Sequence, residues 1–220
     1  MSDELKFGRR APLSGKARHM IVVLHGYGAD GADLLGLADP LGQHLPDAVF
    51  YAPDAPDPCS GNPFGRQWFG IPRFDGSTLD QAMAGLTRAE NAVNRFIDAR
   101  LNDEGLSATD LILLGFSQGA MTALHVAPRR AAALAGVVAI SGRLIAPERL
   151  APETIAKPPI LLLHGDRDDV VDFSEMAIAG NALLAAGFDT YGHVMKGSGH
   201  GIAPDGLQVA LAFMKDRLNI

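Results

Sequence analysis

The chain has 220 residues, of which 47% are hydrophobic and 20% are charged, and its formal net charge is -6. This length and apolar content predict one domain over residues 1–220 with a sizeable core. An acidic chain repels nucleic-acid phosphates, so a nucleic-acid partner is not expected. The single cysteine, Cys59, excludes an intrachain disulfide, and its surroundings lack the spacing of metal ligands, so no metal is expected either.

Short apolar runs alternate with longer helical patterns along the chain. The predicted elements in chain order are strands at residues 20–24 and 48–52, a helix at about 78–100, a strand at 111–114, a helix ending near 126, strands at 136–140 and 160–163, a helix at 173–186, a strand at 190–195 and a helix at 205–218. This alternation predicts a mostly parallel central sheet with helices on both faces. The Pro/Gly-rich segment at about residues 53–76 is the longest irregular stretch, and loops of that length often carry function.

The distribution of apolar residues also bears on location and on access to the site. No apolar run approaches the roughly 18 residues of a membrane-spanning helix, and the first residues lack the apolar core of a signal peptide. The sequence therefore predicts a cytoplasmic protein without stable membrane insertion. Between Ser141 and Ile160 there is too little chain for a large cap domain, so we expect a fairly open site.

The strongest local signal is Gly115-Phe116-Ser117-Gln118-Gly119, which matches the pattern G-x-S-x-G. In that pattern a serine stands on a sharp strand-to-helix turn, and small residues on either side let neighbouring segments pass closely. The apolar run LILL precedes the motif here and a helical stretch follows it. Ser117 is therefore predicted to be the nucleophile of an α/β-hydrolase fold. The alternative for such a serine is an ordinary helix cap.

A serine nucleophile needs a base within hydrogen-bond reach, and in this fold the chain order is serine, acid, histidine. Of the seven histidines, that order leaves His193 and His200. His193 lies inside the strand-like run YGHVMK, whereas His200 lies in the loop GSGHG before the last helix, so His200 is the predicted base. The acid should follow the strand at residues 160–163, where four aspartates compete: Asp166, Asp168, Asp169 and Asp172.

An oxyanion hole would complete such a site. One donor is expected to be the backbone N–H of Gln118, directly after the nucleophile, and the other the backbone N–H of Tyr27 in the loop after the first predicted strand. The side chains of these two residues need not take part in the chemistry.

The same loop supports a competing hypothesis of another class. Gly26, Gly28 and Gly31 match G-x-G-x-x-G after a strand, and Asp54 follows the next strand, as in a dinucleotide-binding protein. Helical periodicity begins only near Asp33, however, and nucleotide binding does not account for the ordered motifs GFSQG, HGDRDD and GSGHG. A non-catalytic binding protein of the hydrolase fold is disfavoured because the full set of motifs is present.

Taken together, the segments VVLHGYGAD, QWFGI, GFSQGA, HGDRDDVV and GSGHGI resemble the phospholipase/carboxylesterase family, which includes acyl-protein thioesterases. The resemblance implies a triad of Ser117, Asp168 and His200, with Asp169 as the reserve acid. It implies no cofactor and a possible homodimer. The family's R-x-W-[FY]-D element appears here as Arg66 to Gly70, with glycine in place of the acid, so the local contacts of this loop stay open.

The expected reaction is hydrolysis of a small-molecule carboxylic ester with a short to medium acyl chain, through an acyl-enzyme. Acyl-protein thioesters and lysophospholipids are alternatives with the same mechanism. Trp68 and Phe69 lie in the segment expected to flank the acyl pocket, and they serve either as substrate contacts or in core packing.

Overall fold

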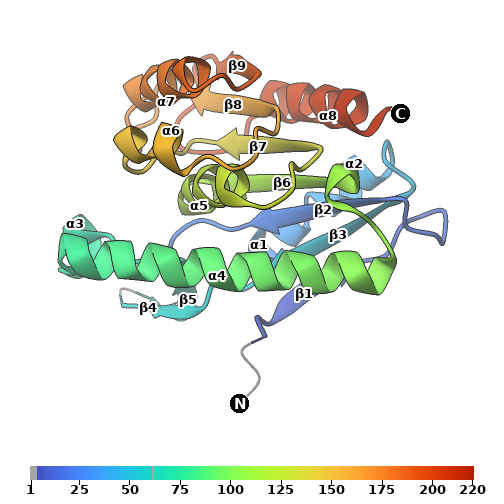
Figure 1. Ribbon diagram of the computed structural model, residues 1–220, viewed down its shortest axis with the longest axis horizontal. Coiled ribbons are helices and arrows are strands. Elements are labelled where there is room, and N and C mark those ends of the chain that lie inside the picture. Colours follow the sequence, from blue (N-terminus) through green and yellow to red (C-terminus); the bar gives the residue numbers. More distant parts are fainter. Residues whose placement is uncertain (1–3, 61) are drawn as a thin grey trace.

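A seven-stranded sheet forms the centre of the computed structural model, which describes residues 4–60 and 62–220 (Figure 1). Its strands are β1 (Phe7–Arg10), β2 (His19–Leu24), β3 (Ala48–Pro53), β6 (Leu111–Phe116), β7 (Gly136–Ile140), β8 (Ile160–Gly165) and β9 (Thr190–Met195). They lie in the order β1-β3-β2-β6-β7-β8-β9. Every neighbouring pair is parallel except β1 with β3. The predicted mostly parallel sheet of an α/β-hydrolase is thereby confirmed.

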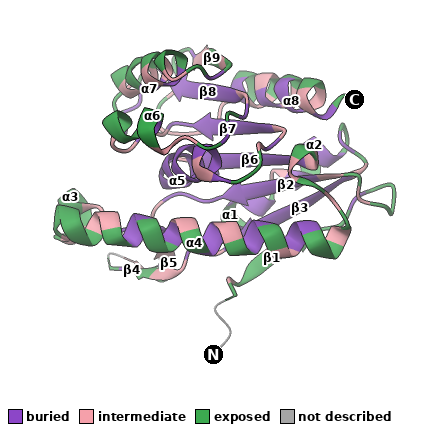
Figure 2. Cartoon of the chain, in the orientation of Figure 1, coloured by how far each residue is buried: buried purple, intermediate pink, exposed green. Residues whose placement is uncertain are grey.

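Helices cover both faces of this sheet. They are α1 (Gly31–Leu35), α2 (Ala38–Gly42), α3 (Pro72–Asp75), α4 (Leu79–Glu104), α5 (Gln118–Val126), α6 (Leu150–Glu153), α7 (Ser174–Ala185) and α8 (Pro204–Leu218), with short 3-10 turns at Ala108–Asp110, Ala127–Arg129 and Pro147–Arg149. Side chains alternate along β2: Met20 and Val22 join the core beneath α4, α5 and α7, whereas Ile21 and Val23 join the core beneath α1, α2 and α8. Figure 2 shows the central strands as almost entirely buried.

The longest helix, α4, shows how the sequence sets its ends. Thr78 caps the N-terminus, with its side chain accepting from the Gln81 amide while the Gln81 side chain accepts from the Thr78 amide. Gly105 ends the helix in the left-handed conformation that favours glycine. The buried face follows the helical period, from Leu86 through Val93 and Ile97 to Leu101. The helix thus continues four residues past its predicted end.

Several regions differ from the expectation, since the short helices α1, α2 and α6 were not predicted either. The segment predicted as irregular contains the hairpin of β4 (Asp57–Cys59) and β5 (Asn62–Gln67) followed by α3. The edge strand β1, with the sequence FGRR, was not predicted. It is mostly exposed and pairs on one side only, so it carries no apolar run that a sequence pattern would register.

The topology leaves one natural place for a site. From β2 the chain crosses through α1 and α2 to β3, and it returns through α4, on the opposite face, to β6. Because the chain leaves the carboxyl ends of β2 and β6 toward opposite faces, a crevice opens between them, where ligands bind in open parallel sheets.

Candidate active site

Ser117 stands at the junction of β6 and α5 in a conformation that few non-glycine residues adopt, with φ 53° and ψ −117°. Its neighbours must be small. A Cβ on Gly115 would lie 2.3 Å from the Gly119 carbonyl oxygen, and a Cβ on Gly119 would lie 2.0 Å from the Leu24 carbonyl oxygen. The turn that the motif predicts is therefore present, and both flanking glycines are sterically required.

The structure brings Ser117, His200 and Asp168 together at the carboxyl ends of β6, β9 and β8. The Ser117 Oγ lies 3.0 Å from His200 Nε2, and His200 Nδ1 lies 2.8 Å from Asp168 Oδ2. Since a carboxylate only accepts hydrogen bonds, Nδ1–H donates to Asp168 and Nε2 is left to accept from the serine hydroxyl. The geometry is that of a nucleophile, a base and an orienting acid.

The Asp168 carboxylate is fully buried but well supplied with donors. Burial raises the pKa of this carboxyl, yet hydrogen bonds from His200 and from the Val171 and Val170 amides outweigh it, so its pKa falls below the ordinary value. The competing acids lie elsewhere: Asp169 is exposed, Asp172 accepts from the Ser174 amide and hydroxyl, and Asp166 accepts from the Gly197 amide. Among the four, Asp168 is the one that contacts His200.

A second histidine, His164, also borders Asp168 and was missed as a site residue. Its Nε2 donates to the Val171 carbonyl at 2.9 Å and lies 3.3 Å from Asp168 Oδ2. The imidazole is buried and thus braces the turn that carries the acid. His164 ends the apolar run ILLLH directly before the turn that contains Asp168, and this position could have indicated that the two side chains lie close together.

The loop after β2 passes close to Ser117. A Cβ on Gly26 would lie 3.4 Å from the Ser117 Cβ, so the backbone runs close to the serine. Within the described part of the chain, no protein atom accepts a hydrogen bond from the Tyr27 or Gln118 amide. Both predicted oxyanion donors are thus free, and their role stays a prediction.

His25 stabilises the loop after β2 through two hydrogen bonds of its ring. The Ala55 amide donates to His25 Nε2 at 3.0 Å, so the ring proton is on Nδ1, which donates to the Gly26 carbonyl at 2.7 Å. Burial lowers the pKa of this imidazole, which favours the neutral form that these two bonds require.

Trp68 and Phe69 differ in placement. Trp68 is fully buried and does not line the cavity beside Ser117; its indole N–H donates to the His25 carbonyl and its amide donates to the Gln118 side-chain oxygen, each at 2.9 Å. Gln118 in turn donates from Nε2 to the Phe69 carbonyl at 2.7 Å. Phe69 lines the cavity. The Gln118 side chain therefore ties this segment to the nucleophile turn, a link that the sequence did not reveal.

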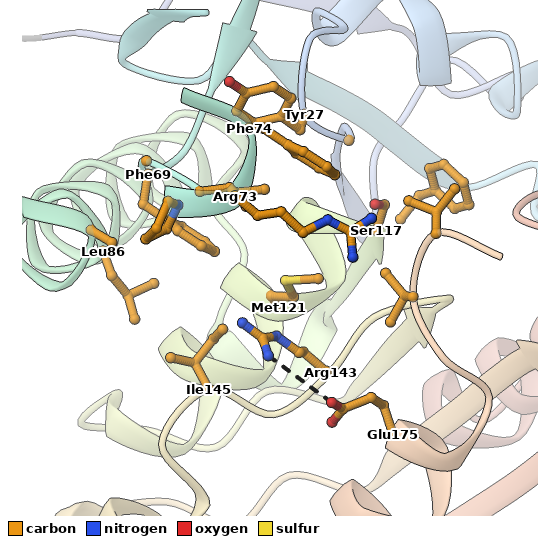
Figure 3. A pocket seen from close by; sticks show the side chains of 18 of the residues that line it. Tyr27, Phe69, Arg73, Phe74, Leu86, Ser117, Met121, Arg143, Ile145 and Glu175 are labelled. Carbon is orange, nitrogen blue, oxygen red and sulfur yellow. Dashed lines mark ion pairs between the residues drawn. The ribbon is translucent and has the colours of Figure 1, made fainter. Parts of the chain in front are cut away.

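A cavity of about 700 Å³ opens beside Ser117 and His200 (Figure 3). Its far wall is apolar and includes Phe69, Leu86, Met121 and Ile145. Helix α3 and the start of α4 form part of its wall, together with Arg143 and Ile145 from the stretch between Ser141 and Ile160. The cavity is also lined by charged side chains, among them Arg73, Arg143 and Asp172.

Gly70, which replaces the acid of the family element, lies where a side chain would collide with α3. A Cβ there would lie 2.6 Å from Ser77 Oγ and 3.1 Å from Asp75 Oδ2. Asp75 accepts from the Ile71 and Ser77 amides, so its carboxylate occupies this spot and closes the α3 turn.

Comparison with known proteins agrees with this geometry. The family model for phospholipases and carboxylesterases matches residues 11–218. The chain belongs to the phospholipase/carboxylesterase family. Esterase YpfH of Escherichia coli is 29% identical, covering 90% of this chain and 83% of its own, and acyl-protein thioesterase 1 of Saccharomyces cerevisiae is 30% identical, covering 92% and 94%. The crystal structure of esterase PE8 is 41% identical with a TM-score of 0.92, covering 98% and 100%.

A phospholipase/carboxylesterase family member is a hydrolase, and the local geometry likewise contradicts the dinucleotide hypothesis. The amides at the start of α1 are already occupied: Asp30 accepts from the Ala32 and Asp33 amides, and Asp54 accepts from the Gly31 amide. Two carboxylates thus fill the position that a pyrophosphate would need.

The described ranges contain neither a candidate metal site nor a helix that could span a membrane. No group of three or more His, Cys, Asp or Glu residues is arranged to hold a metal ion. No helix there combines the length and apolar character needed to cross a membrane.

Proposed function

We propose that this family member hydrolyses carboxylic esters of short to medium acyl chain through an acyl-enzyme on Ser117. The observation that supports this most directly is the chain of contacts from Asp168 through His200 to Ser117, which opens on an apolar cavity of about 700 Å³. A hydroxyl hydrogen-bonded to an oriented imidazole, next to an apolar pocket, suits attack on an acyl carbonyl.

The mechanism follows from this geometry in two halves. Ser117 Oγ attacks the carbonyl carbon while His200 Nε2 takes the hydroxyl proton, and Asp168 stabilises the imidazolium that forms. The Tyr27 and Gln118 amides receive the developing oxyanion. His200 then protonates the departing alcohol or thiol. In the second half a water attacks the acyl-enzyme with His200 again as base, which releases the acid and restores Ser117.

The acyl chain is assigned to the apolar part of the cavity. Phe69, Met83, Leu86 and Ile145 line it, whereas Trp68 is behind the wall and supports the loop after β2. Trp68 is thus proposed as a structural residue and Phe69 as the substrate contact.

Thioester hydrolysis is a second candidate, favoured by one specific similarity. A relative that is 30% identical over nearly its whole length carries the name acyl-protein thioesterase 1. The cavity wall continues along α4 to Leu79, which is exposed, so a longer acyl chain has an apolar path out of the cavity.

The decisive experiment is pre-steady-state kinetics on p-nitrophenyl acyl esters of increasing length, with wild type, Ser117→Ala and the remote control Ser14→Ala. We expect a burst close to one equivalent in wild type and in the control, and none in Ser117→Ala. Equal turnover by Ser117→Ala would overturn the assignment of the nucleophile. A steep rise toward long chains, with thioesters cleaved faster than esters, would instead favour the thioesterase function.

A further inference from the structure

An unusual stack of side chains stands on the α3 side of the cavity. The ring of Tyr27 lies 5.8 Å from that of Phe74, and the Arg73 guanidinium carbon lies 5.2 Å from the Phe74 ring centroid. Asp75 fixes the α3 turn that carries Phe74 and Arg73. Figure 3 shows Arg73 extending from α3 across the cavity toward the side where Ser117 lies.

Arg73 differs from the other arginine of the cavity in lacking an anionic partner. Arg143 pairs with Glu175 at 4.0 Å (Figure 3). For Arg73, by contrast, no hydrogen bond or ion pair to a protein group occurs among residues 4–60 and 62–220. An aromatic face holds a guanidinium in place while its N–H groups, which point outward in the guanidinium plane, stay available.

The remaining carboxylates of the cavity do not serve as its partner. Asp172 accepts from the Ser174 amide and hydroxyl, and these bonds lower its pKa. Asp33 lies in the first turn of α1 and makes no ion pair with Arg73. The cavity is lined by side chains of both charges and has no overall positive potential. An anionic ligand would therefore have to contact Arg73 directly.

We propose that Arg73 binds an oxyanion group of the substrate, so that esters bearing a carboxylate or phosphate are the preferred substrate class. This inference rests on the proposed ester hydrolysis at Ser117. A guanidinium matches the two oxygens of a carboxylate or phosphate with two parallel hydrogen bonds. Because Arg73 reaches toward Ser117 rather than toward Leu86 and Ile145, the anionic group lies near the scissile bond and not at the end of the acyl chain (Figure 3).

The test compares one neutral chromogenic ester with three esters that carry an anionic group. p-Nitrophenyl butyrate is the neutral reference, and 3-carboxy-4-nitrophenyl butyrate carries a carboxylate on the leaving group. The mono-p-nitrophenyl ester of adipic acid carries it on the acyl side, and butyryl-lysophosphatidic acid carries a phosphate. The variants are Arg73→Gln, Arg73→Lys and Arg73→Glu, with Arg18→Gln, an exposed residue at the opposite end of β2, as the control for net charge.

The readout is the ratio of kcat/KM for the anionic ester to kcat/KM for the neutral ester. Arg73→Gln is expected to lower this ratio by about 10- to 100-fold, as befits loss of a hydrogen-bonded charge. Arg73→Lys should retain part of it, Arg73→Glu should reverse the preference, and Arg18→Gln should leave it unchanged. The preference should appear with the two esters that carry the charge on the leaving group; a preference for the adipate ester alone would overturn the placement of the anionic group near the scissile bond.

Two failures are distinguishable. If wild type cleaves the neutral ester but the ratio is the same in Arg73→Gln, Arg73 is only a wall of the cavity and the inference is wrong. If wild type cleaves none of the esters, the proposed function itself fails. A parallel fall for neutral and anionic esters in all three Arg73 variants would also overturn the inference, since it would show damage to the α3 wall.

Discussion

Replacing Asp168 by asparagine tests the proposed triad sharply, because the surroundings of this side chain dictate how the amide must sit. Oδ1 accepts from the Val170 and Val171 amides at 2.9 Å each, and Oδ2 faces His200 Nδ1 at 2.8 Å. In the variant only the amide oxygen can accept from the two backbone donors, so the NH₂ group is turned toward His200. Nδ1 must then accept, and the ring proton moves to Nε2, facing Ser117.

An imidazole protonated on Nε2 cannot take the serine proton, and the lost carboxylate no longer stabilises the imidazolium. The expected loss in kcat is about 10,000-fold, the effect of the same change in a serine triad of known mechanism. That corresponds to roughly 5 kcal/mol of activation free energy. KM should change little, because the Asp168 side chain is buried and does not line the cavity.

The assay is steady-state hydrolysis of p-nitrophenyl butyrate by Asp168→Asn and by the neighbouring exposed variant Asp169→Asn. Asp169→Asn should stay within about twofold of wild type, as is usual for an exposed side chain. If Asp168→Asn kept more than a tenth of the activity, the tautomer argument would be refuted. If Asp169→Asn lost activity instead, the acid would have to be reassigned to Asp169.

Three further predictions concern the support of the site. Trp68→Phe removes the indole N–H that donates to the His25 carbonyl. The free energy of unfolding should fall by about 1–3 kcal/mol, and kcat should fall as well. A urea denaturation curve identical to that of wild type would contradict this prediction. Burial lowers the pKa of His25, so the unfolded chain takes up a proton at higher pH than the folded one. The stability linked to His25 is therefore complete above the ordinary value of 6.5 and is lost as pH falls below it; urea midpoints across this range should flatten in His25→Gln. Gly119→Ala should fail to fold stably because its Cβ meets the Leu24 carbonyl, whereas Gly36→Ala, with open space around it, should melt like wild type in calorimetry.

The sequence predicted the elements whose cause is local. The strands β2, β6 and β8 are buried on both faces, so their sequences are continuous apolar runs. Each strand can therefore be predicted without knowing which strands lie beside it. The spacing of G-x-S-x-G likewise reflects a local steric requirement, because a Cβ on Gly115 would collide with the Gly119 carbonyl oxygen. The chain order of this fold, serine before acid before histidine, limited the candidate histidines to two, whereas Asp168 was chosen among four aspartates only through the family resemblance.

The contacts missed from sequence join segments far apart in the chain. Gln118 and Trp68, His25 and Ala55, and the pairing of β1 with β3 each depend on which loops the sheet order brings together. A buried glutamine or histidine gives no periodic signal, and its partner is a backbone group that any residue could supply. For the same reason the sequence did not decide whether Trp68 and Phe69 contact the substrate or pack in the core. The fold distinguishes them, because Trp68 is buried behind the cavity wall and Phe69 lines the cavity.

These long-range bonds join the segment of Trp68 and Phe69, which carries part of the proposed acyl-binding wall, and the predicted oxyanion hole into one hydrogen-bonded unit. Trp68 donates to the carbonyl of His25, two residues before the Tyr27 amide, and to the side chain of Gln118, whose own amide is the other predicted donor. A shift of the segment that forms the acyl wall therefore displaces both donors together. Substitutions that enlarge the cavity at Phe69 should consequently alter kcat as well as KM, because the backbone that carries the wall also aims the amides at the reacting carbonyl.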